Sequence, residues 1–304
     1  MTAKVIIQDY LSRPNISNLC RLIDLPDEVT ESVLNHVENV DFSAVNPYFG
    51  NLFPSETTGQ SVKIIEMICS EQGVLIDHGY IIMTVFLAAA LHTRELYAKA
   101  GIDDFIYIDT MGFFKRAVRE YKEINGVYGF DRTWWWWRQL SLTIFRIGTL
   151  EFEMCIVGYP EQFGFHGEKD IPVLWVHIPS DAVMTREMLD YSYKTAHAFF
   201  NKHYPDFKYR CICSAPWFLS PILKSILQPG SKILDFQSDY AITGINVNDQ
   251  SYFPLVFKLK EKPADLSVLP EDTSLQRAIK KLLIEESGKI GLAAGVFVNS
   301  RSLL

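Results

Sequence analysis

The sequence has few features of secreted, membrane-spanning or nucleic-acid-binding proteins. It contains no run of lysine and arginine, and its formal net charge of −7 disfavours a broad nucleic-acid surface. The N-terminal residues show no apolar core with a small-residue cleavage site. The longest uncharged apolar segment, 79–91, is shorter than the about 20 residues that cross a bilayer. We therefore expect a cytoplasmic protein with neither a nucleic-acid nor a membrane partner.

Cysteine is also scarce, and its placement argues against a disulfide framework. The five cysteines are odd in number and scattered along the chain: Cys20, Cys69, Cys155, Cys211 and Cys213. Cys211 and Cys213 would share one face of a strand, but no second Cys or His pair stands at the spacing of a zinc finger. We expect neither a disulfide scaffold nor a bound metal.

What is present is the composition of an ordinary folded protein, with 48% hydrophobic and 21% charged residues among 304. This length is sufficient for two domains with cores of their own, although one elaborate domain is also possible. Residues 1–125 carry helical signals only. We expect an all-helical N-terminal domain there, with helices that begin near Pro26, Ser61, Asp77 and Asp103, the last running to about residue 123.

The hydrophobic period changes beyond Gly126, so we expect a second domain over 126–304. Four adjacent tryptophans, 134–137, join the helical part to the first strand and cannot all face one way. Because indole rings bury well and carry an N–H that needs a partner, they either pack between the domains or line a substrate surface. In the second case Trp135 and Trp136 are the candidates for substrate binding.

Two alternating segments, 140–145 and 150–157, predict a β-hairpin with one apolar and one polar face. A three-residue loop, 146–148, with its glycine in the left-handed conformation keeps the apolar residues of both strands on the same side. Glu151 and Glu153 then share the polar face.

A continuous apolar run, 173–178, predicts a buried central strand that Pro179 stops. The elements expected after it are a helix over 185–201, a strand over 209–214, a helix from Pro216, strands over 233–236 and 255–259, and a last helix ending at Gly288.

Several short motifs accompany this order of elements: WWWWRQ (134–139), FRIG (145–148), LEFE (150–153), VHIP (176–179), AFF (198–200), Cys213 with Trp217, and LPEDTSLQRA (269–278). In the order of its elements and in these motifs, the chain resembles the N-acetyltransferase superfamily called GNAT. More closely, it resembles a family of bacterial acyltransferases with a helical N-terminal domain and a GNAT-like C-terminal domain. The resemblance covers nearly the whole chain. It implies an α+β protein, an all-helical N-terminal domain followed by a GNAT-like mixed, mostly antiparallel sheet with flanking helices.

The resemblance also implies an activity, acyl transfer from acetyl-CoA or another acyl-CoA to a small-molecule amine or related acceptor. The central strand should then diverge from strand 209–214 at their C-terminal ends, to admit a pantetheine arm. The usual glycine-containing pyrophosphate loop is missing, because 178–183 reads Ile-Pro-Ser-Asp-Ala-Val, and Asp181 adds negative charge. Ile178 and Ser180 stand where that loop would bind the cofactor. The alternative is a non-catalytic binding module that kept the fold and lost the loop.

Acyl transfer to an amine needs a base, a group that polarises the thioester and an acid for the leaving thiolate. Glu153, with Glu151 as second choice, is the candidate base, against the alternative of solvated strand acids. His177 ends the central strand and titrates in a range that suits a base, but it can equally be a hydrogen-bonded core residue. Cys213 and Ser214 close the neighbouring strand and are candidates for the acid.

A third possible function is a cysteine hydrolase or transferase that uses Cys213 with His177, for which no third orienting group is visible. Trp217 is a further candidate for substrate binding. We expect Glu153 and His177 to face a common cleft, roofed partly by the helical domain and the tryptophans, where lost hydration would raise the pKa of the carboxyl.

Overall fold

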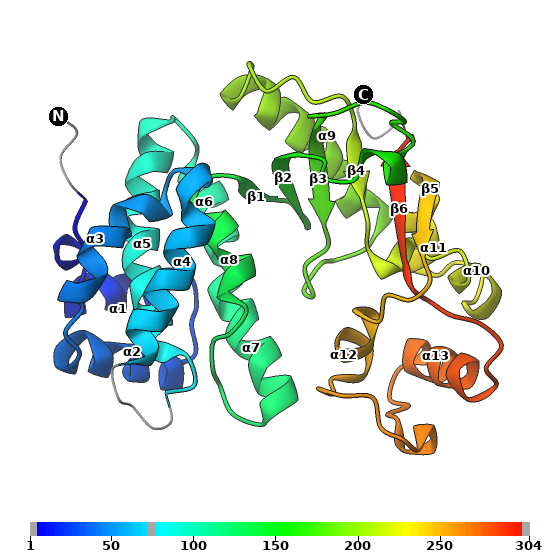
Figure 1. Ribbon diagram of the computed structural model, residues 1–304, viewed down its shortest axis with the longest axis horizontal. Coiled ribbons are helices and arrows are strands. Elements are labelled where there is room, and N and C mark those ends of the chain that lie inside the picture. The colour runs from blue at the N-terminus through cyan, green and yellow to red at the C-terminus, as the bar shows by residue number, and fades with distance from the viewer. Residues whose placement is uncertain (1–4, 72–76, 300–304) are drawn as a thin grey trace. The chain divides into compact units, whose positions relative to one another are not determined.

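The computed structural model describes residues 5–71 and 77–299. These residues belong to two compact units, Met1–Arg146 and Ile147–Leu304 (Figure 1). The first unit is helical and the second contains a sheet with flanking helices, as the sequence predicts.

Eight α-helices and three 3₁₀ turns make up the described part of the first unit. They are η1 (Ile7–Asp9), α1 (Arg13–Leu22), α2 (Asp27–Asn39), η2 (Ser43–Val45), α3 (Asn46–Phe49), η3 (Gly50–Leu52), α4 (Ser55–Ser70), α5 (Tyr80–Lys99), α6 (Asp104–Met111), α7 (Phe113–Asn125) and α8 (Thr133–Leu140). Helix α5 begins at Tyr80, three residues after the predicted start at Asp77, and the Asp77 carboxylate accepts a hydrogen bond from the Ile81 amide at 3.1 Å.

Helix α5 is the core of this unit and contacts α1, α2, α4, α6 and α8. It extends well beyond the apolar segment 79–91, and by length and composition it could cross a membrane. However, 67% of its most apolar window is buried inside the protein, which is typical of the core helix of a folded domain.

The end of the helical unit differs from the expectation. The tryptophans lie on α8, which runs to Leu140, so the expected first strand begins at Ile144 rather than at Leu140. A helix of this length buries one side, here Trp136, Gln139 and Leu140, and the apparent alternation that followed was too short to distinguish the two periods. The helical unit accordingly continues to Arg146, past the expected boundary near residue 125.

In the part of the chain that the structure describes, the sheet has six strands in the order β1-β2-β3-β4-β6-β5. They are β1 (Ile144–Ile147), β2 (Leu150–Ile156), β3 (Pro172–His177), β4 (Ile212–Ser214), β5 (Tyr240–Asn246) and β6 (Leu292–Phe297). Strands β3 and β4 pair in parallel, whereas β3 with β2, β6 with β4, and β5 with β6 pair antiparallel. The predicted mixed, mostly antiparallel sheet is therefore confirmed.

The turn between β1 and β2 is shorter than predicted, since it consists of Gly148 and Thr149 alone. Gly148 has φ +62°, and a Cβ atom at this position would lie 2.4 Å from the Oγ of Ser192. The Thr149 amide donates to the same Oγ at 2.9 Å. The turn is thus tied to helix α9 (Arg186–His203), which carries Ser192.

Each face of the sheet has its own cover. On one face Phe152 of β2 meets Tyr193 of α9, with ring centroids 6.0 Å apart. On the other face, η4 (Pro160–Phe163) and its neighbours pack over the strands. This second cluster comprises Val157, Phe163, Ile171, Val173, Cys213 and Ala294. Because both faces are covered, the pairing register of β2 and β3 cannot slip without burying charge against apolar groups.

The elements after β4 depart most from the prediction. They include η5 (Trp217–Leu219), α10 (Leu223–Ile226), α11 (Lys232–Gln237), α12 (Tyr252–Phe257), η6 (Leu266–Val268) and α13 (Ser274–Ile284). The strands expected over 233–236 and 255–259 are wrong, because these segments are α11 and α12. In α12, Phe253, Val256 and Phe257 enter one core at helical spacing. The closing strands are instead β5 and β6.

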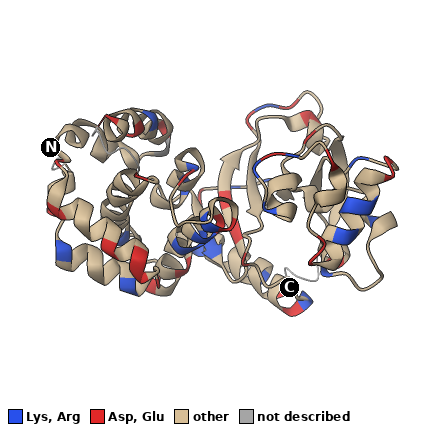
Figure 2. Ribbon diagram, turned by 90° about the horizontal axis from the view of Figure 1, so that it is seen from below, with Lys and Arg blue, Asp and Glu red and all other residues tan. Residues whose placement is uncertain are grey.

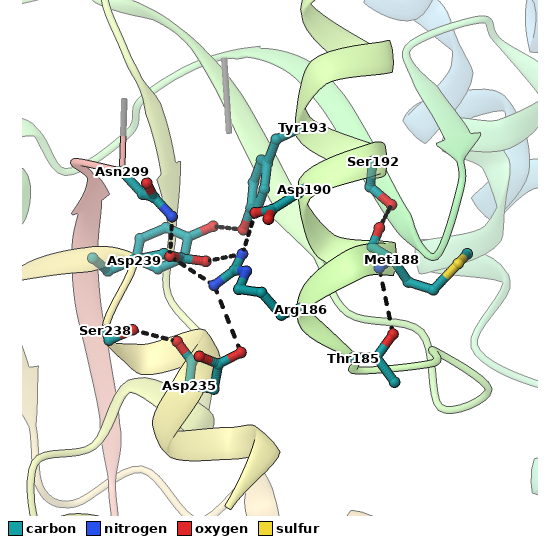
Figure 3. Close-up of polar contacts among 11 residues, drawn as sticks. Thr185, Arg186, Met188, Asp190, Ser192, Tyr193, Asp235, Ser238, Asp239 and Asn299 are labelled. Carbon is teal, nitrogen blue, oxygen red and sulfur yellow. Dashed lines mark hydrogen bonds and ion pairs between the residues drawn. The ribbon is translucent and has the colours of Figure 1, made fainter. Parts of the chain in front are cut away.

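An ion network secures the start of α9 (Figure 3). The Arg186 guanidinium donates two hydrogen bonds to Asp239, at 2.9 and 2.7 Å, and lies 2.9 Å from Asp190 and 3.6 Å from Asp235. Asn299, beyond β6, donates to Asp239 at 2.6 Å. The network therefore connects α9 to α11 and to the residues that flank β5 and β6.

Burial makes this network energetically sensitive. The Asp239 side chain is 2% exposed, and burial raises its pKa although Arg186 and Asn299 donate to it. Burial alone would lower the pKa of Arg186, but its bonds to the carboxylates outweigh that effect and raise the pKa. Each group therefore depends on the other for its stabilisation.

We predict that Asp239→Ala lowers the free energy of unfolding by about 2–3 kcal/mol, because it leaves Arg186 without its bidentate partner. The value is below that of a fully buried pair because Arg186 is one-third exposed. Urea unfolding measures the change. Asp190→Ala, which removes a half-exposed carboxylate from the same arginine, should cost about 0.5 kcal/mol or less. Equal losses in the two variants would contradict this assignment.

Candidate active site

Glu153 and His177 meet on the face of the sheet that η4 covers. In the ladder between β2 and β3, Glu153 is opposite Trp175 and Glu151 is opposite His177. Glu153 and His177 are thus diagonal neighbours, and Glu153 Oε2 lies 2.7 Å from His177 Nε2. The structure brings together the first-choice base and the histidine selected from the sequence.

Neither acid is a solvated strand residue. The side chains of Glu153 and His177 are 14% and 16% exposed, and Glu151 is 2% exposed. Carboxylates are rarely buried unless they have hydrogen-bond partners, so this burial favours a specific role over a surface one. Glu151 stays the second choice, since it lies across the ladder from His177.

The contact determines which ring nitrogen of His177 carries the proton. An ionised carboxylate can only accept hydrogen bonds, so Nε2 of the neutral imidazole must be the donor to Glu153. Nδ1 is then the proton-accepting nitrogen. A carboxylate that holds one ring nitrogen in this way also stabilises the imidazolium that forms when the other takes a proton.

Trp175 is a part of this site that the sequence analysis did not select. Its ring lies nearly parallel to that of His177, with centroids 6.3 Å apart at 26°, and Phe163 of η4 meets it edge-on at 5.2 Å. The sequence could have predicted this position, because side chains alternate along a strand and residues 173, 175 and 177 therefore share one face. The indole forms an aromatic wall beside the pair.

The backbone ladder between β3 and β4 ends beside this pair, and the expected divergence of the two strands to admit a pantetheine arm stays a prediction. Their register consists of Leu174 with Ile212 and Trp175 with Cys213. Beyond these pairs the Ser214 hydroxyl donates to the Val176 carbonyl at 2.7 Å. The hydroxyl proton proposed from the sequence as a catalytic acid is directed at a backbone carbonyl.

Cys213 lies in the core rather than in an open site. It is fully buried, and its pKa is raised by a hydrogen bond to Cys211 and by burial, so the thiol stays protonated. The same bond lowers the pKa of Cys211. A protonated, buried thiol is a poor nucleophile, and the partner of His177 is Glu153. These observations favour the core interpretation of Cys213 over the cysteine-enzyme alternative.

The connection between β3 and α9 contains the proposed cofactor residues Ile178 and Ser180. No glycine occurs between residues 178 and 185. The Ala182 amide donates to the Pro179 carbonyl, and the Val183 amide donates to Thr149 Oγ1 of the hairpin turn. The first turn of α9 presents Arg186, which three carboxylates already neutralise.

The tryptophans selected from the sequence lie in different places. Trp136 is 3% exposed and stacks on Phe113 within the helical unit, with centroids 5.3 Å apart. Trp135, on the same helix, has the Arg138 guanidinium over its ring at 4.6 Å. Trp217 belongs to the core formed with α12 and α13. Trp136 thus packs inside the helical unit, and Trp217 packs inside the second unit. Packing of the tryptophans between the domains stays a prediction, as does binding of Trp135, Trp136 or Trp217 to substrate.

Among residues 5–71 and 77–299, no three His, Cys, Asp or Glu side chains are grouped so that they could hold a metal ion. Basic and acidic residues occur in both units (Figure 2). The expectation that no nucleic acid binds stays a prediction.

Comparison with known proteins agrees with this architecture. Residues 14–142 match the model of an N-acyltransferase N-terminal domain, and residues 144–297 match that of a GNAT-like C-terminal domain. No curated protein matches the sequence.

Similar solved structures include acyltransferase complexes. One contains decanoyl-CoA and teicoplanin; it is 20% identical, with a TM-score of 0.73, and the match covers 93% of this chain and 87% of that one. Another contains CoA and 10C-teicoplanin, at 21% identity and a TM-score of 0.73, covering 92% and 86%. A third, with decanoyl-CoA, has 18% identity and a TM-score of 0.72, covering 93% and 87%. At these identities the likeness establishes the fold. Because the second family model alone spans half of the sequence, the chain belongs to the family defined by the GNAT-like C-terminal domain, here preceded by an N-acyltransferase N-terminal domain.

Proposed function

We propose that this protein transfers an acyl group from an acyl-CoA to an amine of a small molecule. The observation that carries the proposal is the 2.7 Å contact between Glu153 and His177 beside the point where the ladder between β3 and β4 ends. A proton acceptor and an opening for an extended donor are required together for this reaction.

In the proposed reaction the amine nitrogen attacks the carbonyl carbon of the thioester. The C–N bond forms, the C–S bond breaks, and the amine proton moves to Nδ1 of His177. Glu153 holds Nε2–H and stabilises the imidazolium. The imidazolium then gives the proton to the leaving thiolate, so the products are an amide and the free thiol of CoA. A separate acid from Cys213 or Ser214 is not needed.

The comparisons support the donor class. The first matched domain is described as an N-acyltransferase N-terminal domain and the second as a GNAT-like C-terminal domain. The similar solved structures contain decanoyl-CoA with teicoplanin, or CoA with 10C-teicoplanin. We extend acyl-CoA to this chain as the co-substrate. For the acceptor we propose only its reacting group, an amine. The proposed base acts on the proton of that amine, and no other part of the acceptor is assigned a contact.

A second function, a binding module without catalysis, is favoured by the start of α9. Ordinary members bind the cofactor pyrophosphate with amides of a glycine-containing turn and a helix N-terminus. Here that turn lacks glycine, and Arg186 is neutralised by Asp190, Asp235 and Asp239. A protein that binds acyl-CoA and releases no thiol with any amine would support this alternative.

We propose a cytoplasmic location for the protein. All five cysteines, each among the described residues, are free thiols, which suits a reducing compartment. Fractionation of cells that express the chain, with a compartment marker, tests this location.

We predict that Glu153→Gln lowers kcat about 10²- to 10⁴-fold and changes the KM for the acyl donor little. The amide keeps the shape of the side chain but cannot hold Nε2–H as an ionised acceptor. The assay follows thiol release from octanoyl-CoA or decanoyl-CoA with a panel of primary amines. Product mass identifies the amine that reacts.

The matched control is Glu161→Gln, which changes an exposed acid of η4 in the same unit. It should retain the kcat of the unaltered protein. Unchanged turnover in Glu153→Gln would remove Glu153 from the mechanism. A drop confined to the donor KM would indicate a binding role instead.

We also predict that His177→Asn lowers kcat as much as Glu153→Gln does, because an amide side chain has no basic nitrogen. The Kd for CoA should stay within about threefold of that of the unaltered protein. Isothermal titration with CoA measures the binding. Loss of binding together with turnover would place His177 in donor recognition rather than proton transfer.

A further inference from the structure

The Val176 carbonyl lies where the pairing between β3 and β4 stops. A parallel ladder that continued by one more pair would join Val176 to Ser214, and the Ala215 amide would donate to this carbonyl. The observed register ends one pair earlier, at Trp175 with Cys213. Pro216 follows and turns the chain into η5. Strand β4 therefore leaves β3 before it supplies that backbone donor.

Strand β3 itself continues past this point. Val176 and His177 remain paired with Phe152 and Glu151 of β2. Successive residues of a strand point their backbone groups to opposite neighbours, and the Leu174 amide donates to the carbonyl of Cys211, the residue just before β4. Val176, two residues on, must also direct its carbonyl toward β4. On this edge of β3, the Val176 carbonyl is thus a hydrogen-bond acceptor to which the backbone of β4 supplies no donor.

The Ser214 hydroxyl supplies the missing donor. It is 1% exposed and donates to the Val176 carbonyl at 2.7 Å. A buried carbonyl without a donor is costly, so the hydroxyl stabilises the separated strands in the free protein. A side-chain donor can be exchanged for another by rotation about one bond, whereas a ladder amide cannot.

We propose that Ser214 is a latch that holds the place of a ligand amide between β3 and β4. An extended arm with an amide N–H enters beyond Trp175, donates to the Val176 carbonyl and displaces the Ser214 hydroxyl. This inference rests on the proposed function for the identity of the arm, the pantetheine part of an acyl-CoA, which contains two amides. Ser214 is then a positioning residue rather than the catalytic acid considered from the sequence.

If Ser214 is a latch, removing its hydroxyl should raise the affinity for CoA, whereas removing a residue that only supports the site should lower that affinity. In Ser214→Ala, the Val176 carbonyl has no donor until the arm provides one, and no bond must be broken on entry. Binding of CoA should therefore tighten about two- to tenfold, the size of one neutral hydrogen bond. Ser214→Cys introduces a weaker donor of similar shape, so its affinity for CoA should lie between those of the unaltered protein and Ser214→Ala. This second variant keeps the test valid if the alanine variant does not fold.

Isothermal titration of the full chain with CoA, and separately with pantetheine, measures the effect. Ser220→Ala is the matched control, because its buried hydroxyl donates to the Ile290 carbonyl in the same unit but away from β3. This control should lose stability and keep the affinity for both probes.

The outcomes separate the latch from the proposed function. Tighter binding in Ser214→Ala supports the latch, and equal or weaker binding overturns it even if the unaltered protein binds CoA and turns over. Binding of pantetheine that tightens in Ser214→Ala, without binding of CoA, keeps the latch and removes the CoA-dependent function. Failure of both probes to bind any variant overturns both.

Discussion

The antiparallel ladder between β2 and β3 is the constraint on which the rest of the site depends. Its register places Glu153 opposite Trp175, and only from there does the carboxylate reach His177 on the diagonal. A slip of one residue would turn both acids of β2 toward the apolar cover of α9 and would expose Phe152 to the other face. Cores on both faces oppose such a slip. The apolar packing of the sheet therefore determines the geometry of its polar pair.

The carboxylates of the second unit show two uses of buried charge. Glu153 has an imidazole partner that can gain and lose a proton, so its contact is compatible with proton transfer. Asp239 has a guanidinium partner that stays protonated, so its contact can only position α9 against the strands. The second contact also consumes the positive charge at the start of α9. A phosphate-bearing donor therefore finds no unpaired guanidinium at Arg186.

The sequence predicted the parts of the fold in which neighbouring residues carry a clear period. The helical first unit, strands β2 and β3, and helix α9 agree with expectation in kind and approximate position. The errors lie where short apolar segments allow two periods. Residues 233–236 and 255–259 suit a strand or a helix equally, and the core around Phe253 and Phe257 selected the helix. Strand β6 is rich in alanine and glycine, which are poor strand formers, so only pairing with β4 and β5 makes it a strand.

For the candidate site, the sequence by itself determined that Glu153 and His177 end up on strands and that Glu153 lies on the polar face of its hairpin. Period and chain order are local properties, and they are sufficient for this. Only the tertiary structure decided that the two side chains touch, that Trp175 forms their wall, and that Ser214 bonds to Val176, 38 residues away in the chain. The pairing of Arg186 with Asp239, 53 residues apart, is of the same kind. Such contacts depend on which strands become neighbours and in what register, and that choice is made by the burial of the whole core rather than by any short segment.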